Sequence, residues 1–213
     1  MCLMLHTVTQ SIGNRLRVVF QRPDDSNDRS RTEDSLPAPA LLPLVEFVAY
    51  AEDCILYGRV RLAADRLTDM LNEHDEFELV DVMVERLDGL GAVEVRQVLV
   101  RRNELLLVHA TGPRGNQARR TRTREHPLAI RIGPYEVRGD LHAFPGHDPL
   151  MTIRRRKTMV PLTDAWIEYQ AGFERRRRRA GALVVNREQI DSVINAIDEW
   201  VELPDLPFQA DGS

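Results

Sequence analysis

The chain has 213 residues, of which 43% are apolar and 29% are charged. That length suits one large domain or two small ones with a real core. The apolar fraction, with 12 Gly, 12 Pro and 2 Cys, excludes collagen-like, disulfide-scaffold and wholly disordered proteins. No apolar run reaches the roughly 18 residues of a membrane-spanning helix. The first twenty residues lack the continuous apolar stretch of a signal peptide, so we expect a cytoplasmic protein.

The chain divides at two polar segments. The N-terminal extension, residues 1–44, contains a polar, Pro-containing stretch at 21–40 that is predicted to be a disordered linker. A second, basic linker is expected at 112–126, because it opens with Gly-Pro and ends before a proline. These linkers leave two ordered segments, 45–111 and 127–203, followed by a tail at 204–213.

Charge separates the two segments. Residues 45–112 hold 7 Arg against 14 acidic side chains, a net charge of −7. Residues 113–188 hold 16 Arg and one Lys against 8 acidic side chains, a net charge of +9. The preference for Arg over Lys can reflect genome composition, but that does not explain the clustering.

The first segment begins with short runs rich in β-branched and aromatic residues, which predict antiparallel strands. The runs are 55–62, 77–84 and 98–105. Leu67, Met70 and Leu71 fall at helical spacing within 63–72, so a short helix is expected there. Cys54 is expected to be a small buried hydrophobic residue.

The second segment repeats the pattern at matching spacing. Its runs are 135–142, 160–167 and 183–190, with Gly139 in the place of Gly58 and Asp164 in the place of Asp81. We interpret this as an internal duplication. A Gly inside a strand marks a bulge or bend, and five strands in such a segment suit a small closed barrel. The predicted fold is therefore mainly β, with two tandem small antiparallel barrels of SH3 or Sm type and one or two short helices.

The end of the second segment admits two interpretations. Apolar residues from Ile190 to Val201 fit one helix, with Asn186 as N-cap. The repeat instead favours a helical turn at 187–189, a strand near 190–194 and then a helix or tail. We prefer the interpretation based on the repeat.

The repeated motif resembles the Sm-like barrel of Sm, LSm and Hfq proteins. The first copy has Gly58, Asp69, Met70, Asn72, Leu79, Asp81 and Val82, and the second has Gly139, Leu162, Asp164, Ala165 and Val185 to Ile190. The segment 66–72 also resembles a bacterial single-barrel family of unknown function. Arg154 falls near the place of Asn72, and neither copy has the closing Arg-Gly of the Sm family. The resemblance therefore implies the barrel fold and an RNA-binding ancestry rather than the family's base pocket.

Three basic clusters in the second half are the candidate binding residues. They are Arg119, Arg120, Arg122 and Arg124; Arg154, Arg155, Arg156 and Lys157; and Arg175, Arg176, Arg177, Arg178 and Arg179. The last cluster is expected in a solvated hairpin loop, since five consecutive like charges should not pack. Arginine binds phosphate in a bidentate manner, so these clusters indicate nucleic acid, or alternatively an acidic protein surface.

No catalytic triad, Cys-His pair or P-loop can be argued, so we expect no enzyme and no cofactor. Asp140, His142, His147 and Asp148 lie close in sequence, but their spacing matches no metal site, so no metal is expected either. The sequence thus predicts a non-enzymatic nucleic-acid-binding protein, with RNA before DNA. The alternative is a protein-interaction or oligomeric scaffold module, including a possible homo-oligomer, with no membrane partner.

Overall fold

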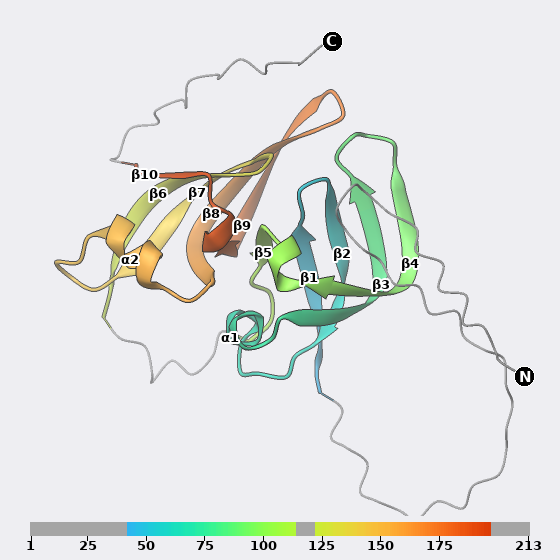
Figure 1. The fold of residues 1–213 in the computed structure, drawn as a ribbon, viewed down its shortest axis with the longest axis horizontal. Coiled ribbons are helices and arrows are strands. Elements are labelled where there is room, and N and C mark those ends of the chain that lie inside the picture. The colour runs from blue at the N-terminus through green and yellow to red at the C-terminus, as the bar shows by residue number, and fades with distance from the viewer. Residues whose placement is uncertain (1–41, 114–121, 197–213) are drawn as a thin grey trace, which may run out of the picture.

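The computed structural model describes residues 42–113 and 122–196 (Figure 1). The predicted disordered stretch at 21–40, most of the N-terminal extension, residues 197–203 and the tail at 204–213 lie outside the described residues. So do Arg119 and Arg120 of the first basic cluster.

The described residues form ten strands and two α-helices. In the first half these are β1 (Leu44–Tyr50), β2 (Cys54–Arg61), α1 (Leu67–Glu73), β3 (Glu76–Arg86), β4 (Ala92–Arg101) and β5 (Leu107–His109). In the second half they are β6 (Arg124–Ile132), β7 (Tyr135–Ala143), α2 (Pro149–Arg155), β8 (Met159–Ala171), β9 (Glu174–Asn186) and β10 (Ser192–Asn195). The fold is mainly β, as the sequence predicts.

The strands do not separate into two closed barrels. All ten belong to one antiparallel sheet in the order β10-β6-β7-β8-β9-β5-β1-β2-β3-β4, and this sheet stays open between its end strands β10 and β4. β5 pairs with β1 of its own half and with β9 of the other half, where Leu107 faces Val185. Because β9 occupies the free side of β5, β4 does not pair with β5 and the first half does not close.

Two hydrophobic cores lie on the sheet, and each takes residues from both halves. The first contains Phe47, Leu56 and Leu79 with Met159 and Val184 from the second half. The second is built mainly from β6 to β9 but includes four residues of the first half, Tyr50, Ile55, Leu106 and Leu107. Successive residues of a strand point to opposite faces of a sheet, so short β5 serves both cores at once. The halves are therefore packed together, not merely tethered.

Each half contains the same bulge. The pairing of β2 with β3 shifts register between Tyr57 and Arg59, and the pairing of β7 with β8 shifts between Arg138 and Asp140. Opposite these shifts Asp81 and Asp164 adopt positive φ, 51° and 48°, the only two non-glycine residues to do so in the described chain. Aspartate tolerates this region better than most residues.

The helices were predicted in part. The helix expected at 63–72 is α1, and Leu67, Met70 and Leu71 are buried as their spacing indicates. α2 was missed, although Asp148 and Pro149 signal its start: the Asp148 side chain accepts a hydrogen bond from the Leu150 amide. No helix among the described residues is long and apolar enough to cross a membrane.

The C-terminal part follows the interpretation based on the repeat. A short 3-10 turn spans Arg187–Gln189 and β10 follows, so residues 192–195 form a strand and not a helix. β10 pairs with β6, with Val193 opposite Ile130. Cys54 is 1% exposed, as expected, and burial raises the pKa of its thiol to about 12.

Candidate functional site

The five consecutive arginines, Arg175–Arg179, do not form a loop. They lie on β9 and pair with β8, from Gln170 opposite Arg175 to Trp166 opposite Arg179. The turn of this hairpin lies earlier, at Gly172 and Phe173. The prediction of a solvated loop was wrong because it considered charge repulsion along the chain and not the partners that neighbouring strands supply.

Acidic side chains pair with this arginine run, and an aromatic ring packs against it. Arg175 and Arg177 pair with Glu168, and Arg179 pairs with Asp164 at 2.6 Å. The guanidinium of Arg177 lies 4.2 Å from the centroid of a Trp166 ring. These carboxylate and aromatic partners compete with phosphate for the arginine side chains, although Arg175 and Arg179 remain exposed.

The even-numbered arginines of the run reach across to the first half. Arg176 donates to Glu85 at 2.5 Å, and Arg178 lies 3.8 Å from the same carboxylate and over the ring of Tyr57. Tyr57 donates its hydroxyl proton to Glu85 at 2.8 Å. Burial raises the pKa of the Glu85 carboxyl, but these hydrogen bonds and the two arginine charges outweigh it and hold the pKa below its usual value. This cluster joins β3 to β9.

The second basic cluster differs from the arginine run. Arg154 and Arg155 end α2, and Arg156 and Lys157 follow it, and all four are exposed. Among the described residues, no carboxylate lies within ion-pair distance of any of the four. Arg156 donates to the backbone oxygen of His142 at 2.7 Å. Within the described residues, these cations therefore have no intramolecular counter-charge that would compete with a ligand.

The first basic cluster is only partly described. Arg122 precedes β6 and is exposed. Arg124 belongs to β6 and faces Ala143 of β7, so it is not part of a linker as predicted. β6 begins at residue 124, three residues earlier than the expected start of the ordered segment at 127.

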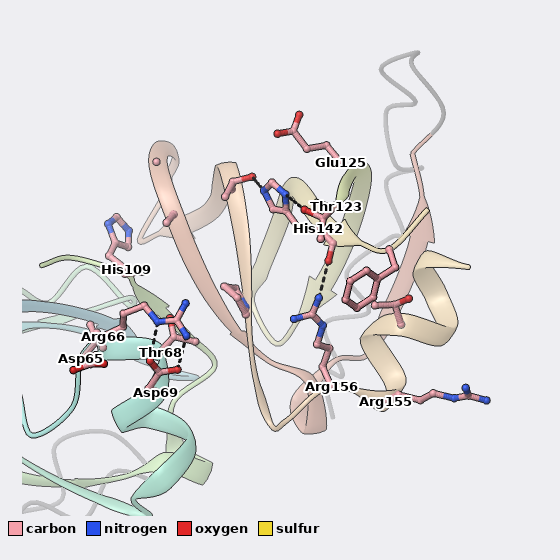
Figure 2. Close-up of a pocket in the computed structure, with 18 of the residues that line it drawn as sticks. Asp65, Arg66, Thr68, Asp69, His109, Thr123, Glu125, His142, Arg155 and Arg156 are labelled. Atoms are coloured by element: carbon pink, nitrogen blue, oxygen red, sulfur yellow. Dashed lines mark hydrogen bonds and ion pairs between the residues drawn. The ribbon is translucent and has the colours of Figure 1, made fainter. Parts of the chain in front are cut away.

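A groove of about 1580 Å³ separates α1 from α2 (Figure 2). Its floor is formed by small or compact residues of β8 and β9, including Pro161, Gly181 and Ala182. One wall carries Asp65, Arg66 and Asp69 at the start of α1. The opposite wall carries Arg155 and Arg156 with the residues that lead from β7 into α2.

Polar side chains between the walls are linked to one another. The His142 ring lies between two hydroxyls, with Nδ1 3.2 Å from Thr123 Oγ1 and Nε2 2.9 Å from Thr163 Oγ1. Figure 2 shows Thr123 and His142 next to Arg156. On the opposite side, His109 Nε2 lies 3.0 Å from the Tyr50 hydroxyl, and burial lowers the pKa of His109.

One aromatic side chain is exposed in the groove. Phe144 is 46% exposed, and its ring meets that of His147 edge-on, with centroids 5.7 Å apart. Both residues line the groove on the side of α2. Sequence reasoning considered His147 only as a metal ligand and missed Phe144, because which elements border the groove depends on contacts between residues far apart in the chain. The α1 wall is acidic by contrast, although Arg66 binds Asp69 at 2.7 Å and 2.9 Å.

The four residues considered for a metal have other contacts. His142 bonds to two threonines, His147 meets the Phe144 ring edge-on, and Asp148 caps α2. Asp140 is partly buried, and burial raises the pKa of its carboxyl. Within 42–113 and 122–196, no group of three His, Cys, Asp or Glu side chains is placed to hold a metal ion.

Neither a family model, nor a curated protein, nor a solved structure matches the chain. The functional argument therefore depends on the residues of the groove and the sheet.

Proposed function

We propose that the protein is a non-enzymatic binding protein for single-stranded nucleic acid, with RNA before DNA, and that the strand lies along the α2 wall of the groove. One observation carries the proposal: exposed cations without a carboxylate partner among the described residues border the same groove as an exposed aromatic ring. Single-strand sites combine these two elements, a basic track for phosphates and an aromatic face for bases.

The cations at α2 supply the electrostatic part. Arg155 and Arg156 line the groove, and Arg154 and Lys157 flank them in the chain. Each phosphate contact releases counterions, so binding of this kind weakens steeply as salt increases. Such contacts do not read base identity, and we expect weak sequence selectivity.

Phe144 supplies the stacking part. Its exposed ring can take one base, and a stacked base is worth about 1–3 kcal/mol. The hydroxyls of Thr123 and Thr163 and the ring of His142 offer hydrogen-bond partners to the sugar or base nearby. The acidic residues Asp65 and Asp69 on the far wall would repel phosphates and keep the strand on the α2 side.

This proposal moves the site away from the arginine run. Arg175–Arg179 have intramolecular partners, whereas residues 154–157 have no carboxylate within ion-pair distance in the described part of the chain. The preference for RNA depends on the resemblance to Sm-like proteins. We also infer that the two halves are repeats of one small β-fold, which the matching bulges at Gly58 and Gly139 and the matching backbone at Asp81 and Asp164 support.

The test is a titration of a short fluorescent RNA and of the DNA of the same sequence, at about 0.05 M and about 0.2 M salt. We expect R155S/R156S to weaken RNA binding by about tenfold or more, because the two arginines that line the groove are lost. The matched variant R175S/R177S removes the same number of arginines from β9 and should bind like the wild type.

Three results would contradict the proposal. They are absence of RNA binding at low salt, equal affinity of R155S/R156S and the wild type, and a greater loss in R175S/R177S than in R155S/R156S. F144A tests stacking separately: its affinity should fall while the dependence of binding on salt stays unchanged, because no charge is removed.

A further inference from the structure

The two end strands of the sheet each have an unpaired side within the described part of the chain. β10 pairs only with β6, and β4 pairs only with β3. Figure 1 shows them at opposite ends of the molecule. Unpaired strand edges carry backbone groups that can pair with another chain.

The junction between the halves shows how such edges meet in this protein. β5 pairs with β9 in the register Leu107–Val185, Val108–Val184 and His109–Leu183. Backbone hydrogen bonds extend the junction at both ends, from Asn186 to Leu106 at 2.9 Å and from Ala110 to Ala182 at 3.0 Å. Val108 and Val184 are both fully buried by this contact.

β10 occupies in the second half the place that β5 occupies in the first. Leu107 faces Tyr50 on β1, and Ser192 faces Arg131 on β6. The residue before each makes the same backbone bond: Leu106 donates to Tyr50 at 2.9 Å, and Asp191 donates to Arg131 at 3.0 Å.

β4 likewise occupies the place of β9. Leu79 and Leu162 are equivalent, because each lies two residues before the positive-φ aspartate. Val98 faces Leu79 and Leu183 faces Leu162, so Val98 and Leu183 are equivalent. Leu99 thus corresponds to Val184, the residue that the junction buries. Leu99 is 40% exposed at the free edge.

We propose that β10 of one copy pairs antiparallel with β4 of a second copy of this chain, in the register Ser192–Val100, Val193–Leu99 and Ile194–Val98. This repeats the junction of β5 with β9 between molecules. It covers Leu99 and Ile194, which are 40% and 42% exposed in the single chain. The association is head-to-tail, so each copy contributes a different edge.

The charges at the edges fit this occupant. At the internal junction, the Leu106 oxygen accepts a hydrogen bond from the Asn186 amide. Asp191 is the equivalent of Leu106, and Arg101 is the equivalent of Asn186. The register therefore brings Asp191 of one copy to Arg101 of the next. A second contact of the junction joins the Asn72 side chain to the Met159 backbone. Arg154, near the end of α2, is the equivalent of Asn72, and Glu76 is the equivalent of Met159, so Arg154 of one copy lies near Glu76 of the next. Within one copy Arg101 and Glu76 already bind each other, with Arg101 Nε 3.2 Å from Glu76 Oε1, so Asp191 and Arg154 of the other copy would join an existing ion pair.

The same comparison sets the strength of the association. Four apolar or aromatic residues of the first half are buried in the second core, and the equivalent positions at the outer edge of the second half are polar. In order, these pairs are Tyr50 and Arg131, Ile55 and Glu136, Leu106 and Asp191, and Leu107 and Ser192. Much less apolar surface is removed from water than at the internal junction, and ion pairs near the surface are screened by salt. The contact between copies is therefore reversible and weaker at high salt.

Sedimentation velocity of the full chain over a concentration series tests this at about 0.05 M and about 0.5 M salt, where the screening lengths differ severalfold. We expect association at low salt and a dissociation constant at least about tenfold higher at high salt. L99R should abolish association. V93R is the matched control, since Val93 lies on the same strand, is 46% exposed and is outside the paired register.

A mixing experiment tests the direction of pairing. L99R keeps a normal β10, and I194R keeps a normal β4, so each alone should be monomeric while an equimolar mixture should form a dimer. Circular dichroism melts confirm that the variants are folded. A wild-type monomer at low salt, equal loss in V93R and L99R, or a mixture that stays monomeric would overturn the proposal. These results do not depend on nucleic acid, so they are distinct from the test of the proposed function.

Discussion

At the scale of single residues, Glu85 connects the two halves. Its carboxylate accepts from Tyr57 and Arg176 and lies near Arg178, with 22% of its side chain exposed. Hydrogen bonds to a charged, partly buried group contribute more to stability than exposed pairs do. The arginine run that resembled a ligand site thus has a structural partner on the other half.

We expect E85Q to lower the free energy of unfolding by about 1–3 kcal/mol at neutral pH, because two hydrogen-bond donors and the nearby Arg178 lose a charged partner. The folded-state pKa of Glu85 is below its unfolded value. The carboxylate therefore stabilises the protein above the unfolded pKa, about 4.3, and this stability is lost as pH falls through the folded pKa. Urea unfolding of E85Q and wild type should differ at neutral pH and converge in acid. E94Q is the control, because Glu94 is exposed, and it should match the wild type at neutral and at acidic pH. A difference between E85Q and the wild type that stays constant at all pH values would contradict this role.

At the scale of elements, the bulges require glycine on one strand and a positive-φ residue on the next. A Cβ at Gly139 would lie 3.0 Å from Ala165 Cβ and 3.2 Å from Thr163 O, and one at Gly58 would lie 3.0 Å from Val82 Cγ2. The strands approach closely at these points, which bends each half around its core. Asp81 and Asp164 each bind an arginine from the neighbouring strand, Arg59 and Arg179.

We expect G139A to lower the free energy of unfolding by about 1–3 kcal/mol, since its Cβ meets backbone atoms that cannot move cheaply. G58A should be destabilising in the same way. G181A is the control, because a Cβ there meets nothing within 4 Å and the backbone has no positive φ. Thermal melts decide between these expectations, and an equal effect of G181A and G139A would mean that close approach is not the cause.

At the scale of the whole molecule, the halves share their cores. Tyr50 belongs to β1 of the first half, is 0% exposed and packs edge-on against Tyr135 at 5.3 Å and near Tyr169 at 6.0 Å. Tyr135 in return donates to the backbone oxygen of Ala51 at 2.7 Å. Since neither core is complete without the other half, the described chain should unfold as one unit.

Denaturant unfolding followed by far-UV circular dichroism and by tryptophan fluorescence should therefore give coincident transitions. The chain has two tryptophans, so the experiment uses W200F, in which Trp166 alone reports on β8, whereas circular dichroism reports on all the strands. We expect Y50A to destabilise both signals together by about 3–5 kcal/mol, as for other buried aromatic residues. F173A is the control, because Phe173 is fully exposed. Two separate transitions, or a Y50A effect on circular dichroism alone, would show that the halves unfold independently.

The sequence by itself determined the mainly β class, part of the strands, α1, the buried cysteine and the paired Gly and Asp positions, but it placed the first part of β9 in a loop. These features depend on local alternation, helical spacing and backbone preference, which neighbouring residues decide. The tertiary structure alone decided where the strands pair. That pairing places β5 on β9, which leaves the sheet open, and it places Glu85, Glu168 and Asp164 beside the arginine run. Contacts between residues far apart in the chain leave no local pattern. For this reason the sequence favoured Arg175–Arg179 as the site, whereas the groove between α1 and α2 exists only after both halves have packed.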